Sequence, residues 1–513
     1  MRCSETKEVS DPPRMAATRN EDREKLMLKR MLAVGLVLGL AAVMFAGCGG
    51  GTSSTKTVAK ETLFTFIGDT PPASDVLSLR TTITGLTLTQ QDTTHTVTVF
   101  SSSVKVNFAS LRDFSTILNV ASAPEKTYDK ATITFSGTQV VLYDPTQSPP
   151  VRVLNAEMST VSPVIPIGPA LTVVNDEVAA LRLDFDLWRS IKLELDEDGE
   201  LVCKVTPVMT ASPVVVSEGQ SLGEFDDLVG FVSAVSPYRV SDAFTGAFTM
   251  QLLAGTGPAI TVYFTDSTQL LGVSALNQLE TGRVVEVEAV MDKDGNLVAK
   301  TVEVEDRAVL DDEKLAFLGY VISVTRDGSG NVTQFSFYVR EEEPSSGGDV
   351  PLDSVVVVNV SSTTTFQYSS RSANFASLPF DATAVAPGQE LIVHGEYTTM
   401  SEASTIIDAN TIFLKLQTVQ GDLLSLVQVG SDGRTGAFQF APAATLLQGA
   451  PILVFTNNET VFTGVSGLTE LTAESILLVR GLPFYQKQAG TINGVAVPAG
   501  TLVITARQVH QLQ

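Results

Sequence analysis

The sequence predicts an all-β protein, and three observations indicate this class. Beyond residue 60, apolar and polar residues alternate with a period of two in many short runs, whereas sustained 3.6-residue periodicity is hard to find. Turn signals rich in Asp and Gly separate these runs at 198–199, 294–296, 327–330 and 432–433. Three stretches of the second half also open and close with similar residues. We therefore expect a tandem array of small β domains.

The 513 residues include 34 Lys and Arg against 57 Asp and Glu, a formal net charge of −23. Because a strongly acidic chain repels phosphate backbones, nucleic acid is not an expected partner. Three His and three scattered Cys provide little material for a zinc site or a redox centre, so no cofactor is expected. Nucleophile elbows, phosphate loops and dinucleotide fingerprints are absent from the sequence. The composition therefore favours a protein that is not an enzyme.

Residues 27–47 have the pattern of an export signal. A basic leader at 27–30 precedes an uncharged, mostly apolar run at 31–47, which is shorter than the roughly 20 residues that span a bilayer. Ala46, Gly47 and Cys48 follow one another, and this arrangement resembles the lipobox of bacterial lipoproteins, although Phe45 stands where Leu is usual. The resemblance implies that Cys48 is lipidated. The alternative is a single-pass signal anchor in which Cys48 has no role.

Export by this route defines the mature chain. Residues 1–26 are polar and charged, which suggests a mis-annotated extension, and 48–59 predict a flexible Gly/Ser/Thr tether. Removal of 1–47 leaves 26 basic and 51 acidic side chains, a net charge of −25, and Cys203 as the single unmodified cysteine. Gly49 rather than Asp follows the lipidated cysteine, which by resemblance to enteric sorting rules favours the outer membrane. We expect a protein held in the bacterial cell envelope by its N-terminal lipid.

Residues 60–215 predict a β-sandwich. We expect a strand pair at 77–88, a short helix near 108–118, and a hairpin with strands at 193–195 and 201–205. The opening at 68–71, Tyr128, the strand at 183–186 and the end at 204–207 resemble a family of unknown function, numbered 4382, found at the start of bacterial surface lipoproteins. The resemblance implies an immunoglobulin- or transthyretin-like sandwich, and it implies no catalytic residues.

Three repeats follow, predicted at 226–308, 312–416 and 417–513. Each opens near a glycine, at Gly230, Gly319 and Gly421, and passes through a central strand into a Thr-bearing turn at 262–268, 358–364 and 454–460. Each ends on a strand, at 297–304, 406–413 and 502–509. Units of this length hold five or six strands and a small core. They are therefore consecutive domains rather than turns of a solenoid.

The element order within a repeat predicts a small closed or partly open barrel. It runs strand, hairpin, strand, a short helical connection (274–279 in the first repeat) and a strand pair. The opening Gly-x-Val-x-x-Val and the later Gly-x-x-Val-x-Val resemble a family of bacterial extracytoplasmic repeats, a domain of unknown function numbered 5666. The resemblance covers about 230–510. That family is similar to oligonucleotide/oligosaccharide-binding-type barrels, a fold that carries no function by itself.

Few residues are candidates for a site. Asp184 and Asp186 share one face of a strand, where two carboxylates suit Ca²⁺ or an acid/base pair, or a solvated or hydrogen-bonded structural role. Trp188 is a weak candidate for a sugar-stacking platform, with a place in a core or its rim as the alternative. No catalytic residue is expected, and the metal candidates are limited to the two aspartates.

Other chemistry-bearing residues favour structural roles. The 292–296 segment resembles a Ca²⁺ loop, but its Gly falls outside the EF-hand register, so a hairpin turn is expected. His95, His394 and His510 are predicted on strands of different domains, which argues against a metal site. Cys203 on an alternating strand is expected to be buried as a small apolar residue.

These features favour a non-enzymatic, lipid-anchored binding or structural protein. The membrane is the expected partner through the lipid, with a polysaccharide or an envelope protein as a further partner. A carbohydrate-binding surface lipoprotein is the alternative. An envelope hydrolase comes third, because nucleophile and base constellations are missing.

Overall fold

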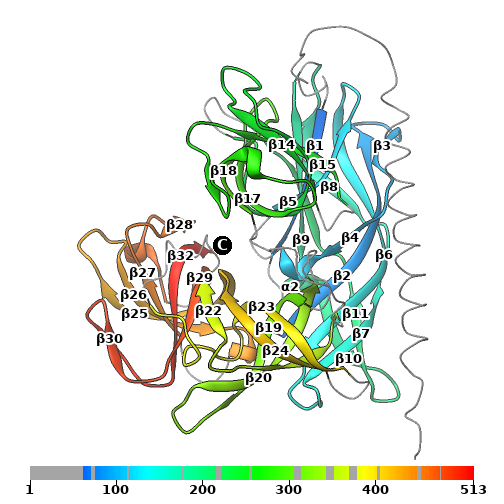
Figure 1. The fold of residues 1–513 in the computed structure, drawn as a ribbon. Coiled ribbons are helices and arrows are strands. Elements are labelled where there is room, and N and C mark those ends of the chain that lie inside the picture. Colours follow the sequence, from blue (N-terminus) through cyan, green and yellow to red (C-terminus); the bar gives the residue numbers. More distant parts are fainter. Residues whose placement is uncertain are drawn as a thin grey trace, which may run out of the picture. The chain divides into compact units, whose positions relative to one another are not determined.

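A computed structural model describes residues 62–70, 75–111, 115–175, 177–214, 221–252, 257–304, 314–342, 352–368, 378–400, 405–447, 452–473 and 475–512. All of them belong to one unit of the chain, Val58–Gln513. The predicted signal, Cys48 and the tether lie outside the described residues. Strands dominate, as Figure 1 shows, and the all-β class predicted from the sequence is confirmed.

The first domain holds twelve strands that hydrogen-bond into one sheet, because β8 pairs with both β6 and β12. Its elements are β1 (Thr62–Thr70), β2 (Val76–Gln90), β3 (Thr96–Phe100), β4 (Val104–Asn107), the 3₁₀ helix η1 (Phe108–Ser110), β5 (Ser115–Ser122), β6 (Thr127–Tyr143), β7 (Val151–Met158), β8 (Val164–Thr172), β9 (Ala179–Asp186), the helix α2 (Leu187–Ser190), β10 (Ile191–Leu195), β11 (Leu201–Val205) and β12 (Met209–Pro213).

The buried side chains of these strands form one hydrophobic core. Alternate residues of β2 and β6 meet those of β1 and β9, and Phe108, Phe135 and Phe185 pack ring against ring at its centre. The predicted hairpin is confirmed, since β10 and β11 pair antiparallel from Ile191↔Val205 to Leu195↔Leu201.

Two predictions for this domain are wrong. The expected strand pair at 77–88 is the single strand β2, because irregularities in its register with β6, including one at Ile83/Gly85, absorb the breaks in alternation. The expected helix near 108–118 is only the single turn η1, and Ser115 begins β5. Leu118 belongs to the core as a strand residue, so the apolar residues of this stretch serve two different elements.

Three six-stranded sheets follow, here called the first, second and third barrels. The first contains β13 (Gly223–Ser236), β14 (Gly246–Leu252), β15 (Ala259–Phe264), β16 (Gln269–Leu271), η3 (Leu276–Gln278), β17 (Val284–Met291) and β18 (Leu297–Val304). The second contains β19 (Lys314–Arg326), β20 (Val332–Glu342), β21 (Val355–Asn359), β22 (Thr365–Tyr368), β23 (Glu390–Met400) and β24 (Thr405–Leu414).

The third barrel has the same six strands and one additional hairpin. Its elements are β25 (Gln417–Val429), β26 (Gly436–Pro442), η4 (Thr445–Leu447), β27 (Ile452–Thr456), β28 (Val461–Thr463), η5 (Leu468–Glu470), β29 (Ile476–Gln486), the hairpin β30 (Gly490–Ile492) and β31 (Val495–Val497), and β32 (Thr501–Gln511).

Each barrel closes in the same way. In the first, the order β15-β14-β13-β17-β18 returns to β15 through a parallel pairing of β15 with β18. The second closes through β21 and β24, and the third through β27 and β32. The barrel repeats predicted from the sequence are therefore confirmed, with five strands in each closed ring and a short sixth strand beside the last one.

The glycine that opens each repeat is required by close packing of strands. A Cβ at Gly230, Gly319 or Gly421 would meet a backbone carbonyl oxygen of the neighbouring strand, that of Gln251, Tyr338 or Ala441 respectively. Any larger residue would push two paired strands apart. The repeat signature in the sequence is thus a backbone requirement of the barrel.

Candidate functional site

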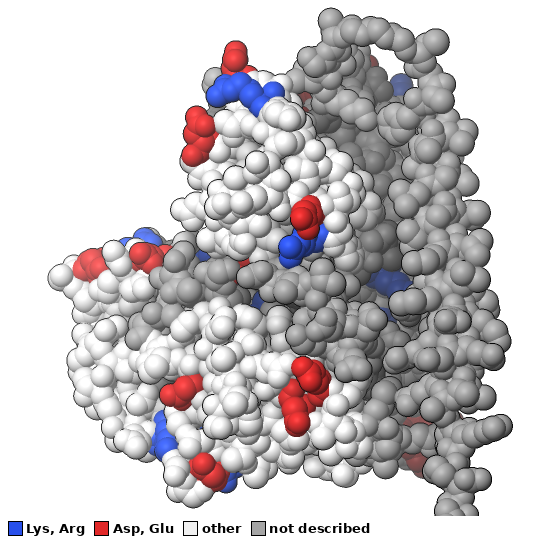
Figure 2. All heavy atoms as spheres, viewed as in Figure 1, with Lys and Arg blue, Asp and Glu red and all other residues white. Residues whose placement is uncertain are grey.

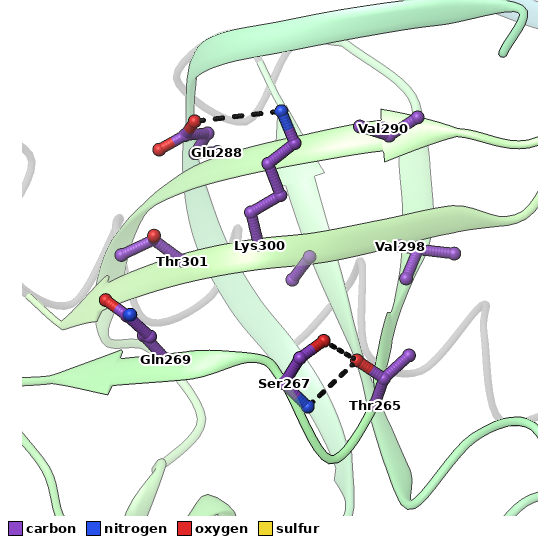
Figure 3. A pocket seen from close by; sticks show the side chains of 9 residues that line it. Thr265, Ser267, Gln269, Glu288, Val290, Val298, Lys300 and Thr301 are labelled. Atoms are coloured by element: carbon purple, nitrogen blue, oxygen red, sulfur yellow. Dashed lines mark hydrogen bonds and ion pairs between the residues drawn. The ribbon is translucent and has the colours of Figure 1, made fainter. Parts of the chain in front are cut away.

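The first barrel carries a surface recess on the outer side of β17 and β18. Its volume is about 390 Å³. Figure 3 shows Glu288 and Val290 on β17 and Lys300 on β18 facing this space. The remaining lining residues come from β18, from the turn before β16 and from β16 itself: Val298, Ala299, Thr301, Thr265, Ser267 and Gln269. We call this set the β17–β18 recess.

Strand alternation places these side chains outward. Val287 and Ala289 of β17 point into the core, so Glu288 and Val290 face the opposite way. On β18, Ala299 and Val302 are buried while Lys300 is exposed. A register irregularity between Glu288 and Ala289 adds one residue to β18 here. Such bulges bend a strand and re-aim side chains.

One carboxylate in the recess lies close to two cations. Lys300 Nζ lies 4.0 Å from Glu288 Oε1, and Arg507 Nη2 of β32 lies 3.3 Å from the same oxygen. Partial burial lowers the pKa of Lys300, and the positive charge of Arg507 adds to the effect. The lone carboxylate among the lining residues is therefore neutralised, and the three groups together carry one net positive charge.

The turn that borders the recess is held by hydroxyl groups. The Thr265 N–H and the Thr268 Oγ1 acceptor lie 2.9 Å apart, and the Thr268 hydroxyl donates to the Ala299 carbonyl oxygen at 2.7 Å. The Oγ1 of Thr265 is 2.9 Å from the Oγ of Ser267. The side of the recess formed by this turn thus presents hydroxyl groups in fixed positions.

The same place in the second barrel carries different side chains. Strand register aligns Glu288 with His394, and Lys300 with Asn410. Asn410 Nδ2 donates to Glu396 Oε1 at 3.2 Å, and the His394 ring packs on Phe413 at 4.9 Å between centroids. The polar groups there bind one another.

In the third barrel the register places Arg480 and Arg507 where the first barrel has Glu288 and Lys300, and a hairpin covers the neighbouring strand β27. The hairpin of β30 and β31 places Ile492, Val495 and Val497 against Leu453 and Phe455 of β27 in a small core outside the barrel. All five are at most 8% exposed. The three barrels therefore present different side chains at this place, with Glu288 and Lys300 in the first, His394 and Asn410 in the second, and Arg480 and Arg507 in the third.

The sequence-predicted site residues lie in the first domain and do not join the recess. Asp184 is half-buried on β9. Asp186 caps helix α2, since its Oδ1 accepts the Arg189 N–H at 2.9 Å, and its Oδ2 lies 3.5 Å from Arg189 Nε. Trp188 is 49% exposed on α2. Among the described residues, no group of three or more His, Cys, Asp or Glu is placed to hold a metal ion.

The other chemistry-bearing residues have structural surroundings. Cys203 is a free thiol, buried in the core of the first domain as predicted, and burial raises its pKa to about 11. The Asp292 carboxylate accepts the Asp294 and Asn296 N–H groups at 2.9 and 2.8 Å, which is a hairpin turn as predicted. His95 is exposed and immediately precedes β3 rather than lying on a strand.

Figure 2 draws the charged side chains on one face of the molecule. Acidic and basic side chains are scattered there, with uncharged surface between them. Within the described part of the chain, no helix is long and apolar enough to cross a membrane.

Sequence reasoning missed the recess. The outward positions of Glu288 and Lys300 follow from alternation, but their neighbourhood depends on which strands pair across the barrel. The Thr-bearing turn was the available signal, since it recurs in all three repeats and borders the recess in the first.

Comparison with known proteins gives a family match for one barrel. No curated protein matches the chain. Two solved structures share little with it: "drosophila Unr CSD456" (11% identity, 56% of this chain and 97% of that chain covered, TM-score 0.14) and the single-stranded DNA binding protein from Thermus aquaticus (12%, 39% and 93%, 0.15). TM-scores this low carry no implication for the chain. Residues 230–303, nearly the whole first barrel, match the family model described as Domain of unknown function (DUF5666).

Proposed function

We propose that this protein is a non-enzymatic binding module of the bacterial cell envelope, anchored by a lipid on Cys48, with its ligand site in the β17–β18 recess. The observation that carries the proposal is the polar recess of the first barrel, whose charged pair the other two barrels do not repeat at the equivalent positions. A concave surface with convergent polar groups on one copy of a repeated scaffold suits a binding role.

Carbohydrate is the ligand class that the recess chemistry favours. Hydroxyl, amide, ammonium and carboxylate groups line one side, and Val290 and Val298 supply apolar surface. Sugars present hydroxyl groups and apolar ring faces together. The hydroxyl groups of Thr265, Ser267 and Thr301 can exchange hydrogen bonds with the hydroxyl groups of a saccharide.

A hydrolase receives less support from this surface. Glycoside hydrolysis commonly needs two carboxylates flanking the scissile bond. Glu288 is the single acid among the lining residues, and it is engaged by Lys300 and Arg507. This recess therefore lacks the paired acid and base.

The ligand proposal is tested by a glycan array probed with the purified full chain, followed by calorimetry on the best ligand. Thr301→Val is expected to weaken binding about tenfold, because it leaves a sugar hydroxyl without its partner. Thr411→Val is the matched control, since Thr411 holds the equivalent place in the second barrel, and should leave binding unchanged. Equal affinities of the wild type and Thr301→Val for the ligand would exclude the recess as the ligand site.

The anchor is tested separately by labelling cells with radioactive palmitate. Label is expected on the protein and lost in Cys48→Ser, which should also release the protein from the membrane fraction. Label that persists in Cys48→Ser would contradict the lipid anchor without affecting the ligand proposal.

A further inference from the structure

An aromatic pair lies beside the β17–β18 recess on the same side of the first barrel. The rings of Phe244 and Tyr263 stack with centroids 4.5 Å apart and an interplanar angle of 27°. Both side chains are half-buried. Burial raises the pKa of Tyr263, and the negative charge of Asp292 adds to the effect, so the ring is partly withdrawn from water and has an acidic neighbour.

Strand register connects this pair to the recess. Tyr263 of β15 is the direct partner of Val298 on β18, and Val298 is the partner of Val290 on β17. Side chains of directly paired residues lie on the same face. Because both valines line the recess, the outer surface runs from the aromatic pair over two valines into the polar pocket. This path crosses three neighbouring strands, so it is about 10 Å long.

The other two barrels lack an open aromatic at this position. In the second barrel the register places Asn359 there, and its Nδ2 donates to Asp408 Oδ1 at 2.7 Å. In the third it places Phe455, which is 4% exposed beneath the hairpin of β30 and β31. Of the three equivalent positions, the one in the first barrel combines an aromatic ring with a neighbouring open recess.

We infer that the Phe244–Tyr263 pair is a second subsite, on which a sugar ring packs its apolar face while a neighbouring sugar occupies the recess. This inference rests on the proposed carbohydrate-binding function and narrows the ligand to an uncharged oligosaccharide longer than one unit. A stacked pair is already held in place, so little side-chain freedom is lost on binding. The acidic neighbour Asp292 disfavours an anionic group on the aromatic pair.

The test is calorimetry of the full chain with cellobiose, maltose, cellohexaose and maltohexaose. One hexasaccharide is expected to bind about tenfold more tightly than its disaccharide, because only the longer sugar reaches both subsites. Tyr263→Ala should remove this advantage and leave disaccharide affinity within about twofold, whereas Tyr263→Phe should retain it. Unchanged disaccharide affinity also shows that the variant is folded. Trp188→Ala, which removes an exposed aromatic of the first domain, is the matched control.

The outcomes separate the two proposals. Absence of binding to all four sugars would contradict both the carbohydrate function and the second subsite. If the Tyr263→Ala variant still binds the hexasaccharide more tightly than the disaccharide, the second subsite is overturned and the carbohydrate function is not. If Trp188→Ala removes this difference instead, the aromatic that stacks on the sugar lies in the first domain. Binding of oligothymidylate that Tyr263→Ala removes would overturn the sugar assignment of the pair.

Discussion

The hydroxyl of Thr268 donates to the carbonyl oxygen of Ala299 at 2.7 Å, and this bond recurs in each barrel. The equivalent pairs are Thr364 with Ala409 and Thr460 with Ala506, both at 2.8 Å. The bond connects the turn after the third strand of the ring to the last strand, next to the parallel pairing that closes the barrel. We therefore expect this bond, called the closure bond or lock below, to stabilise the strand pairing that closes the barrel.

Removal of this lock should loosen one barrel. Thr460 is 1% exposed, and its Oγ1 also accepts the Asn457 N–H at 2.9 Å. Thr460→Val leaves both groups unpaired in a buried place and is expected to cost about 1–3 kcal/mol. Because a chain with several cores does not unfold in one step, hydrogen exchange of third-barrel amides is the suitable measurement. Thr460→Ser should restore protection, and equal exchange in all three proteins would refute the lock.

The opening glycine of the second barrel should not tolerate a side chain. A Cβ at Gly319 would overlap the carbonyl oxygen of Tyr338. Gly319→Ala is therefore expected to destabilise this barrel by about 1–3 kcal/mol. Gly328 is the matched control, since a Cβ at this position would have no other atom within 4 Å. Urea unfolding, monitored by hydrogen exchange of the β19 and β20 amides, compares the Gly319 variant with the same substitution at Gly328. Similar stabilities of the two variants would contradict this account of the repeat signature.

Cys203 should make the first domain sensitive to alkaline pH. Its folded-state pKa of about 11 lies above the ordinary value of 9.0, so the folded state holds the proton more tightly than the unfolded state. The resulting stability is fully present below pH 9 and is lost as the pH rises through 11, a total of about 2–3 kcal/mol. Unfolding between pH 8 and 11 measures this, with Cys203→Ala as the reference. Rapid reaction of the native thiol with iodoacetamide at pH 8 would contradict its burial.

Asp186 should act as a helix cap rather than as a calcium ligand. Asp186→Ala removes the acceptor for the Arg189 N–H and is expected to cost about 1 kcal/mol, whereas Asp186→Asn keeps the cap. Millimolar Ca²⁺ should leave the thermal unfolding of the wild type unchanged. A calcium-dependent rise in unfolding temperature that Asp186→Asn abolishes would restore the metal hypothesis.

The barrels were predictable because their determinants are local in sequence. The glycine that permits close strand approach, the Thr-bearing turn and the alternating strands each occupy a short window that repeats. The predicted element type was wrong at 108–118, where apolar residues belong to a 3₁₀ turn and then to β5. Spacing alone does not separate these two uses of apolar residues.

The recess was not predictable for a different reason. Tyr263 and Val298 become neighbours through a parallel pairing between strands distant in sequence. The proximity of Glu288 to Lys300 depends on a bulge within the last strand pair. Neither the pairing partner nor the bulge is written in the local pattern.

The hairpin of β30 and β31 shows how part of the outer surface of a barrel becomes buried. In the third barrel the chain between the last two ring strands, β29 and β32, is long enough to fold back and turn an outer surface into a core. In the first barrel the same connection is the tight turn at Asp292–Asn296. The length of one connection therefore decides whether the outer face of the third ring strand, at Tyr263 in the first barrel and Phe455 in the third, is half-buried or fully covered, and a short insertion changes this face without altering the barrel that carries it.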